Sequence, residues 1–177
     1  MKNITVFIFV AFLLVSCGSA AVKPEETASS AKTRESSGFS ISLERVDGGT
    51  FSFEEIRGKK HLVAAFWATW CEPCKQELKK LAGMYPDFSD SVEFVGISTD
   101  TEELIDKVNE FAAEAALPFP ILVDPSGNTV SSIIPGGDSV PFMIVVDKNG
   151  AVVSTHSGYN PGDEEALRKE LQELLSR

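Results

Sequence analysis

The feature that most constrains the fold is a pair of cysteines directly after a run of apolar residues. Residues 61–67 (HLVAAFW) are continuously apolar, which is typical of a strand buried on both faces of a sheet. The segment ATWCEPC follows, and apolar side chains then recur with helical spacing over residues 74–85. A buried strand that leads into a helix opening with Cys71 and Cys74 predicts an α/β domain with a redox-active dithiol.

The spacing of the two cysteines predicts a different catalytic role for each. One helical turn brings both sulfur atoms close enough to form a disulfide. The first cysteine lies at the helix N-terminus, where unpaired N–H groups and the helix dipole stabilise a thiolate. We therefore expect Cys71 to attack a substrate disulfide and Cys74, one turn further and facing inward, to resolve the mixed disulfide. Pro73 suits the first turn of the helix, because its missing N–H has no partner to lose there.

The cysteine pair has three alternative interpretations. A structural disulfide that closes so short a loop constrains the unfolded chain very little. Half of a zinc site would need a second pair of ligands, and His61 and His156, the only histidines, have no ligand spacing. Peroxidatic catalysis by Cys71 is the third interpretation.

The remainder of the sequence predicts further strands and helices. Residues 39–53 alternate around Asp47-Gly48-Gly49, which indicates a hairpin. Residues 92–98, 141–146 and 151–155 are expected to form strands, and residues 104–115 and 167–175 carry helical apolar stripes. We expect a central mixed sheet with helices on both faces.

Local signals add finer expectations. Pro86 should end the first helix, and Thr99 should cap the helix that follows the next strand. Residues 119–123 should form a peripheral strand, because prolines at 118 and 120 bound it. In the last helix, ion pairs are expected between Glu164 and Arg168 and between Glu165 and Lys169.

The N-terminus has the pattern of a targeting segment. A positive start and the apolar run at residues 4–15 predict a signal peptide over residues 1–16. The sequence LVSCG resembles a bacterial lipobox, which implies lipidation of Cys17. Residues 17–38 are then a lipidated cysteine and a flexible tether, and residues 39–177 the folded domain. Ordinary cleavage near residues 19–21 is the alternative. The expected location is extracytoplasmic, on a bacterial membrane that faces the periplasm or the cell exterior.

The formal net charge of -10 argues against nucleic-acid binding, because an acidic surface repels phosphate backbones. With Cys17 lipidated, the only cysteines left are Cys71 and Cys74, as expected for one redox pair in an oxidising compartment.

The stretch FWATWCEPCKQE resembles the active site of thioredoxin-fold proteins, and specifically the membrane-anchored branch typified by TlpA and ResA. The resemblance covers residues 39–177 and includes the VGIS strand, the Val140-Pro141 dipeptide and VDKNG. It implies a thioredoxin-like fold with an N-terminal β-hairpin and an inserted helix and strand near residues 100–123. The sequence PFMI after residue 140 departs from the family's usual pattern and leaves the substrate preference open.

The resemblance also implies site residues. Val140-Pro141 matches the position of a cis-proline that faces the dithiol and exposes backbone to a substrate strand, whereas a trans proline that opens a strand is the alternative. Trp70, Glu72 and Pro73 are implied to border the same substrate groove. The buried aspartate of cytosolic thioredoxins corresponds to Ala65 here. Spacing alone makes Glu77 a solvated helix charge, but the resemblance places it beside the thiols, where it could exchange a proton with Cys74.

The expected function is reduction of protein disulfides outside the cytoplasm. Glu72 disfavours a neighbouring thiolate and so favours a reductant, although Lys75 opposes this effect. The resemblance implies electrons from a membrane thiol-transfer protein and a disulfide-containing protein substrate such as apocytochrome c. We expect a monomer that needs no cofactor beyond the Cys71–Cys74 disulfide and no metal.

Two functions of other classes compete with this one. A peroxiredoxin-like thiol peroxidase should have a Pro-x-x-x-Thr/Ser-x-x-Cys arrangement, but Ala64 and Ala68 occupy its first two positions. A non-enzymatic redox sensor would keep the fold without turnover.

Overall fold

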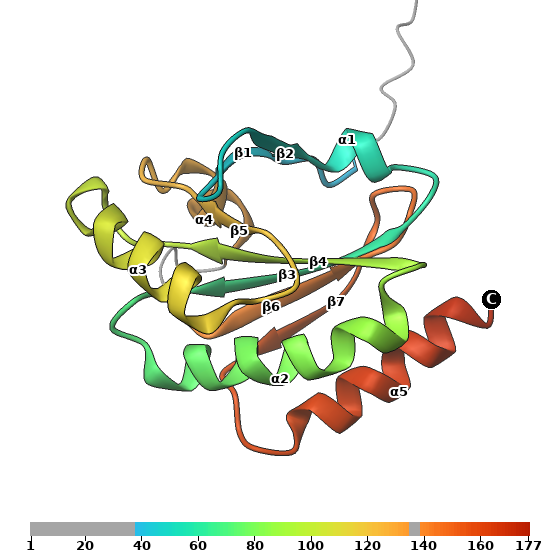
Figure 1. Ribbon diagram of the computed structural model, residues 1–177. Helices are drawn as coiled ribbons and strands as arrows, with labels where there is room; N and C mark the ends of the chain where they lie inside the picture. The colour runs from blue at the N-terminus through green and yellow to red at the C-terminus, as the bar shows by residue number, and fades with distance from the viewer. Residues whose placement is uncertain (1–37, 135–138) are drawn as a thin grey trace, which may run out of the picture. The chain divides into compact units, whose positions relative to one another are not determined.

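The computed structural model describes residues 38–134 and 139–177 (Figure 1). The predicted signal peptide, Cys17, almost all of the predicted tether and most of the loop before residue 140 lie outside these residues. The strands are β1 (Ser42–Arg45), β2 (Thr50–Ser52), β3 (His61–Trp67), β4 (Val92–Ser98), β5 (Ile121–Val123), β6 (Phe142–Val146) and β7 (Val152–Ser157). The helices are α1 (Phe53–Ile56), α2 (Glu72–Phe88), α3 (Ile105–Ala115), α4 (Asn128–Ile133) and α5 (Asp163–Leu175), with a 3-10 turn at Glu102–Leu104.

The strands form one mixed sheet in the order β2-β1-β5-β4-β3-β6-β7. The three central strands β5, β4 and β3 are mutually parallel, and the hairpins β1–β2 and β6–β7 flank them in antiparallel pairing. The prediction of a peripheral strand at residues 119–123 is wrong, because β5 is buried and pairs with both β4 and β1. The added N-terminal hairpin supplies the outer neighbour that converts this strand into an internal one.

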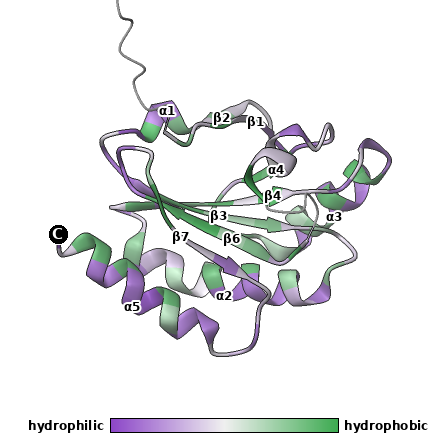
Figure 2. Cartoon of the chain, turned by 180° about the vertical axis from the view of Figure 1, so that it is seen from behind, coloured by the Kyte–Doolittle hydropathy of each residue, from purple (hydrophilic) through white to green (hydrophobic). Residues whose placement is uncertain are grey.

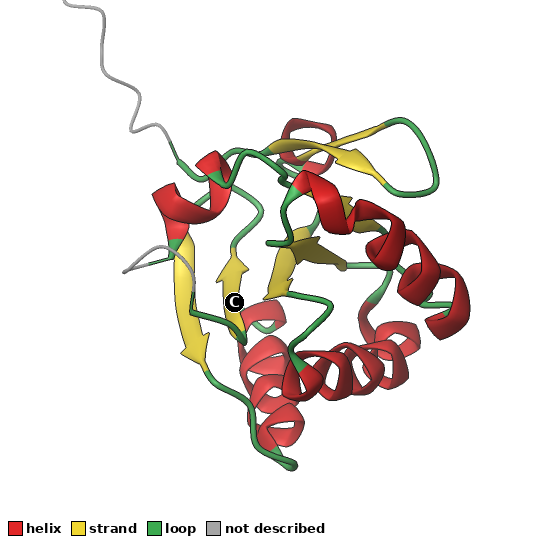
Figure 3. Cartoon of the chain, turned by 90° about the vertical axis from the view of Figure 1, so that its left-hand side faces the viewer, coloured by secondary structure: helices red, strands yellow, loops and turns green. Residues whose placement is uncertain are grey.

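Helices cover both faces of the sheet, as predicted, and each face has its own apolar core. Helices α2, α3 and α5 pack on the face that carries Val63, Ala65 and Trp67. On the opposite face, Phe53 of α1 and the residues that end α4 pack against Leu62 and its neighbours. Apolar residues are concentrated in the strands, whereas α2 and α5 mix hydrophilic and hydrophobic residues along their length (Figure 2). A view from the side shows α2 and α5 together on one side of the sheet (Figure 3).

Several local expectations were wrong. Helix α2 continues past Pro86 to Phe88. Proline lacks an N–H group, so the helix loses only one backbone hydrogen bond at this exposed position. The Ser89 N–H still donates to the Tyr85 carbonyl and closes the last turn. The Thr99 hydroxyl donates to the Trp67 carbonyl and caps no helix.

The expected ion pairs along α5 were also wrong. Arg168 reaches Asp87 of α2 at 2.6 Å, and Lys80 of α2 reaches Glu164 at 3.2 Å. Packing of α5 against α2 gives Arg168 this closer partner, although Arg168 also lies 3.8 Å from Glu165. Lys169 pairs along α5, but with Glu173 at 3.9 Å. The short helices α1 and α4 were missed, since four and six residues carry too little periodicity to detect.

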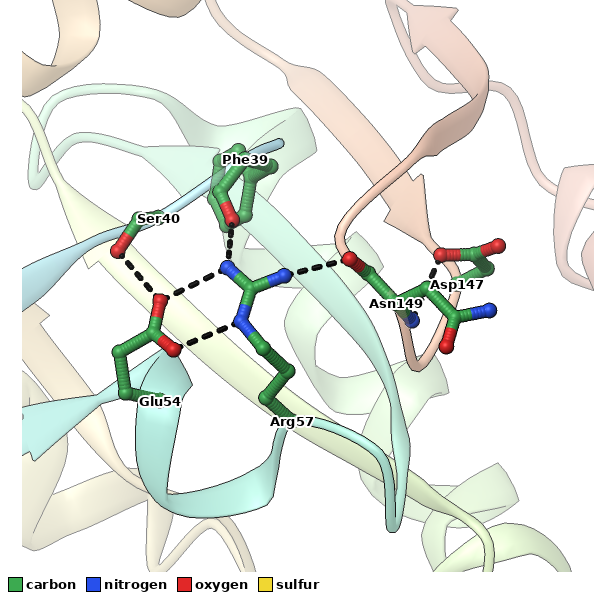
Figure 4. Close-up of polar contacts among 6 residues, drawn as sticks. All are labelled: Phe39, Ser40, Glu54, Arg57, Asp147 and Asn149. Carbon is green, nitrogen blue, oxygen red and sulfur yellow. Dashed lines mark hydrogen bonds and ion pairs between the residues drawn. The ribbon is translucent and has the colours of Figure 1, made fainter. Parts of the chain in front are cut away.

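Arg57 links the first described residues, near Phe39, to the β6–β7 turn through hydrogen bonds. Its guanidinium donates to the carboxylate of Glu54, to the carbonyl of Phe39 and to the carbonyl of Asn149 in the β6–β7 turn (Figure 4). Gly150 of that turn has φ of 93°, and a Cβ atom there would lie 2.3 Å from the Arg57 guanidinium. This close approach explains the glycine, which is the residue best suited to such a backbone conformation.

Candidate active site

Cys71 and Cys74 form a disulfide at the N-terminus of α2, with their Cα atoms 5.3 Å apart. Cys71 is the N-cap residue, and its Sγ accepts a hydrogen bond from the Cys74 backbone N–H at 3.3 Å. Cys74 is fully buried, whereas Cys71 keeps 5% of its surface exposed. An N–H group and the positive end of a 17-residue helix therefore favour a thiolate on Cys71.

A buried carboxylate that the sequence analysis missed holds the loop before Cys71. Asp100 is 2% exposed and follows β4. Its Oδ2 accepts from the Thr69 backbone N–H, and its Oδ1 accepts from the Thr69 hydroxyl, both at 2.8 Å. Ser98 also donates to Oδ2 at 2.8 Å. These bonds tie the loop between β3 and α2 to the neighbouring strand, and so set the position of Trp70 and Cys71.

The sheet brings the second predicted segment to the same end of the domain. Phe66 near the end of β3 pairs with Phe142 at the start of β6, so the chain that leaves toward Cys71 lies beside the chain that enters from Pro141. The Val140–Pro141 peptide bond is cis, as the resemblance implied. Both residues are partly exposed. The carbonyl of Pro141 accepts a hydrogen bond from Gly158 at 2.8 Å.

Trp70 is the most exposed large apolar side chain in the described part of the chain, at 68%. It lies directly before Cys71, so a protein that contacts the disulfide would also cover this indole ring. Exposed Pro73, in the first turn of α2, lies on the other side of Cys71 in the sequence. An exposed aromatic residue beside a reactive group indicates a surface for a protein partner.

Glu72 and Lys75 lie near the cysteines and contact each other. The Lys75 Nζ is 3.9 Å from Glu72 Oε2 and 5.7 Å from the centre of the Phe111 ring on α3. The Glu72 side chain is 69% exposed, so water screens its charge. Its influence on the Cys71 thiolate is therefore small, as Lys75 also opposes it.

Glu77 is the predicted residue whose surroundings differ most from those expected on spacing alone. It is 4% exposed and lies one helical turn after Cys74, on the same buried face of α2. Its Oε2 has no hydrogen-bond partner. Burial, reinforced by the negative charge of Asp163, raises the pKa of Glu77 to about 7. A carboxyl group with this pKa can accept or release a proton near neutral pH.

Two further titratable side chains near Glu77, Tyr159 and Glu164, lie at the start of α5 and in the segment before it. The Glu164 carboxylate accepts hydrogen bonds from the backbone N–H groups of Glu164 and Gly162. These bonds lower the pKa of Glu164 to about 2, so it remains ionised. Desolvation, together with a hydrogen bond to Glu164, raises the pKa of Tyr159 to about 12. Within residues 38–134 and 139–177, no three His, Cys, Asp or Glu side chains lie close enough together to bind a metal ion.

Comparison of the chain with known proteins identifies its family. The AhpC/TSA family profile matches residues 37–155, about two thirds of the chain. The chain belongs to the AhpC/TSA family. Among its relatives, the thioredoxin-like protein YneN of Bacillus subtilis is 32% identical over 120 residues, which are 67% of this chain and 68% of YneN. The thiol-disulfide oxidoreductase ResA of Halalkalibacterium halodurans is 28% identical over 134 residues, 75% of this chain and 72% of ResA.

Solved structures similar to this chain have the thioredoxin-like fold. A putative thiol:disulfide interchange protein DsbE from Chlorobium tepidum has a TM-score of 0.70 and 25% identity, covering 78% of this chain and 94% of that one. The exposed lipoprotein thioredoxin Etrx1 of Streptococcus pneumoniae has a TM-score of 0.65 and 25% identity, covering 76% and 99%. With its Cys71–Cys74 disulfide, this thioredoxin-like member of the AhpC/TSA family is a thiol-disulfide oxidoreductase.

Proposed function

We propose that the chain is a lipid-anchored protein-disulfide reductase that acts outside the cytoplasm. The observation that carries the proposal is the placement of Cys71 at the N-terminus of α2, directly after exposed Trp70 and at the end of the sheet where the chain enters β6 from cis-Pro141. An extended substrate strand would pair with the backbone of Val140, which positions its disulfide beside Cys71.

The reaction balances as a two-electron exchange. The Cys71 thiolate attacks one sulfur atom of the substrate, and the substrate S–S bond breaks to leave a mixed disulfide and a substrate thiolate. Cys74 then gives its proton to Glu77 and attacks Cys71 Sγ, which releases the second substrate thiolate. The protein is oxidised to the Cys71–Cys74 disulfide and the substrate is reduced. A membrane thiol-transfer protein would supply the two electrons that restore the dithiol, so no further cofactor is needed.

The reducing direction rests on the resemblance to the ResA branch, since the exposed Glu72 charge has little influence on Cys71. The same resemblance makes the oxidised Cys-x-x-Cys of an apocytochrome c a candidate substrate. An insulin-reduction assay on the full chain, with Cys71→Ser and Cys74→Ser as controls, tests the activity. We expect turnover in the wild type alone and a trapped mixed disulfide in Cys74→Ser. Absence of turnover in the wild type would contradict the proposal and favour a sensor. Peroxide turnover that is lost in Cys71→Ser would favour a peroxidase.

The reduction potential of the pair tests the direction of electron flow. We expect a value near that of thioredoxin, about −270 mV, whereas a value near −120 mV, typical of a dedicated oxidant, would reverse the assignment. Equilibration with glutathione or a thioredoxin of known potential gives this value.

The proposed anchor is Cys17, and the extracytoplasmic location follows from it. The described residues contain no helix with the length and apolarity needed to cross a membrane. The similarity to Etrx1, named an exposed lipoprotein, supports an anchor of the lipid type. Labelled palmitate should enter the wild-type chain and remain absent from Cys17→Ser, which should also leave the membrane fraction. Equal labelling of the two chains would refute lipidation at Cys17.

A further inference from the structure

The end of the sheet opposite the dithiol carries a groove of about 400 Å³. Strands β3 and β4 begin at this end, where His61 pairs with Val92, and antiparallel β6 finishes there. Figure 1 shows the β6–β7 turn and the end of α5 at the right, whereas α2 begins at the left. The groove lies between that turn, the start of β3 and the end of α5. We call it the basic groove, after its three cations Lys59, Lys148 and Arg177.

The cations of the basic groove have no acidic partner. Within residues 38–134 and 139–177, the lysine and arginine side chains that form no ion pair are Lys59, Lys79, Lys107, Lys148 and Arg177. Three of these five therefore surround a single groove, and all three are exposed. The Lys59 Nζ donates to the backbone carbonyl of Glu55, which leaves its charge uncompensated.

The other titratable groups of the basic groove offset these charges only in part. Among the described residues, Asp147 is the one carboxylate side chain that lines the groove. Its Oδ1 accepts hydrogen bonds from the backbone N–H groups of Asn149 and Ala151, both at 2.8 Å. Desolvation lowers the pKa of His61, so this residue adds no charge at neutral pH. Three side-chain cations thus face one carboxylate that is engaged within its own turn.

The dithiol end of the sheet carries the opposite charge. The 3-10 turn at Glu102–Leu104 follows the end of β4, which lies at the same end as Cys71 because Trp67 pairs with Ser98. Both glutamates of this turn are exposed, and the chain as a whole has a formal net charge of -10. An anionic surface therefore attracts the basic groove and repels the dithiol end.

Exposed apolar side chains surround the basic groove as well. The most exposed large apolar side chains in the described part of the chain are Trp70 at 68%, Val152 at 49%, Val153 at 42% and Leu175 at 39%. Val153 and Leu175 line the groove, and Val152 is the neighbour of Val153 in β7. A small soluble anion would use the cations and leave these aliphatic groups in water. A membrane interface uses both, because it combines anionic headgroups with an apolar boundary.

The described chain begins beside the basic groove. The Phe39 N–H donates to the carbonyl of Gly150 in the β6–β7 turn at 2.7 Å. The sequence predicts a flexible tether of about 20 residues between Cys17 and this point, and such a chain has an r.m.s. length of roughly 25 Å. A lipid on Cys17 would hold this end of the domain near the membrane, where the high effective concentration of the surface lets even a weak contact form.

We propose that the basic groove docks the domain on a bilayer surface that carries anionic phospholipids, with the dithiol turned away from the bilayer toward substrates in solution. The inference rests on the proposed lipid anchor. Lys59, Lys148 and Arg177 face the headgroup phosphates, and the exposed aliphatic side chains lie against the apolar boundary. So few charges give a weak and reversible contact, which lets the domain leave the surface on its tether to meet a membrane electron donor.

The experiment follows amide hydrogen exchange by mass spectrometry on the full chain bound to vesicles. One set of vesicles contains equal parts of phosphatidylcholine and phosphatidylglycerol, and the other contains phosphatidylcholine alone. On the anionic vesicles we expect residues 147–153 and 174–177 to exchange roughly threefold more slowly, or slower still, than on the neutral ones. Residues 99–103, at the dithiol end, should exchange equally on both. Salt at about 1 M, where the Debye length is about 3 Å, should remove the difference.

The groove variant Lys59→Gln/Lys148→Gln is compared with the matched variant Lys79→Gln/Lys107→Gln. The matched variant also removes two unpaired cations, but from α2 and α3, outside the groove. Each cation near an anionic surface favours binding roughly fivefold, so the groove variant should lose the slowing and the matched variant should keep it. All four lysines are exposed, so both proteins should fold.

Two results would overturn the inference. One is equal exchange of residues 147–153 on anionic and neutral vesicles, which would leave the basic groove to a soluble partner. The other is an equal loss of slowing in both double variants, which would show a response to net charge alone.

The anchor and the docking surface fail in different ways. If the wild-type chain takes up no palmitate, the proposed anchor fails, and the exchange experiment on the chain mixed with excess anionic vesicles still tests the basic groove. If palmitate enters the chain and exchange is not slowed on anionic vesicles, only the inference fails.

Discussion

Replacement of Glu77 with glutamine should change the pH dependence of stability more than any change to an exposed carboxylate. Glu77 is 4% exposed, and its pKa is raised from 4.5 to about 7. Each factor of ten in an ionisation constant is worth about 1.4 kcal/mol, so ionised Glu77 costs the fold about 3 kcal/mol. Glutamine keeps the shape of the side chain and cannot ionise.

The sign follows from proton binding. Because the folded-state pKa lies above the unfolded value, the native protein binds more protons between the two pKa values, and stability falls as pH rises. The stabilisation from protonated Glu77 is fully present below 4.5 and is lost by the time pH exceeds about 7. Relative to Glu77→Gln, the wild type should lose about 3 kcal/mol between about pH 4 and about pH 8.

Urea denaturation of both oxidised proteins across this range measures the difference, since neither cysteine titrates in the disulfide. Glu114→Gln, at an exposed position of α3, is the control and should follow the wild type. Parallel stability curves for the wild type and Glu77→Gln would refute the claim that Glu77 is buried in a form that resists ionisation.

Three further predictions concern the scaffold. Asp100→Ala should lower the free energy of unfolding in urea by about 2–4 kcal/mol, because it leaves the donors of Thr69 without their charged acceptor. It should also slow insulin reduction by loosening the loop at Thr69, and unchanged stability would contradict the role of Asp100 in holding that loop. Arg57→Met should speed hydrogen exchange at residues 38–41 without affecting α2, and equal protection would show that the guanidinium bonds are dispensable. Leu78→Ala, at a fully buried position, should cost about 3 kcal/mol by calorimetry, whereas exposed Lys79→Ala should cost little.

Much of the fold could be predicted because its strands and helices carry strong local patterns. The bounds of β3 and β4 match the apolar runs, since strands buried on both faces admit almost no polar residue. The helix that begins at the cysteines, and the pairing of Cys71 with Cys74, follow from spacing along one turn. The position of Pro141 beside this pair came from the resemblance to a known family.

The errors in the fold arose where distant segments meet. Residues 119–123 look peripheral from their prolines, yet β5 is internal because β1 from the N-terminal hairpin pairs with it. Arg168 faces a carboxylate four residues away in the sequence, yet it pairs with Asp87, which the packing of α5 on α2 brings closer. Neither outcome is encoded in a window of neighbouring residues.

The active site divides in the same way. By itself the sequence determined the reactive chemistry: two cysteines one turn apart, at the start of a helix, after a strand too apolar to be exposed. Only the tertiary structure decided how that chemistry is tuned. Asp100 contacts Thr69 from the end of the neighbouring strand β4, and Asp163 affects Glu77 from another helix. Glu77 itself looks like a solvated charge until α5 packs over it. Burial and electrostatic potential are sums over the surrounding chain, so they exist only once the chain has folded.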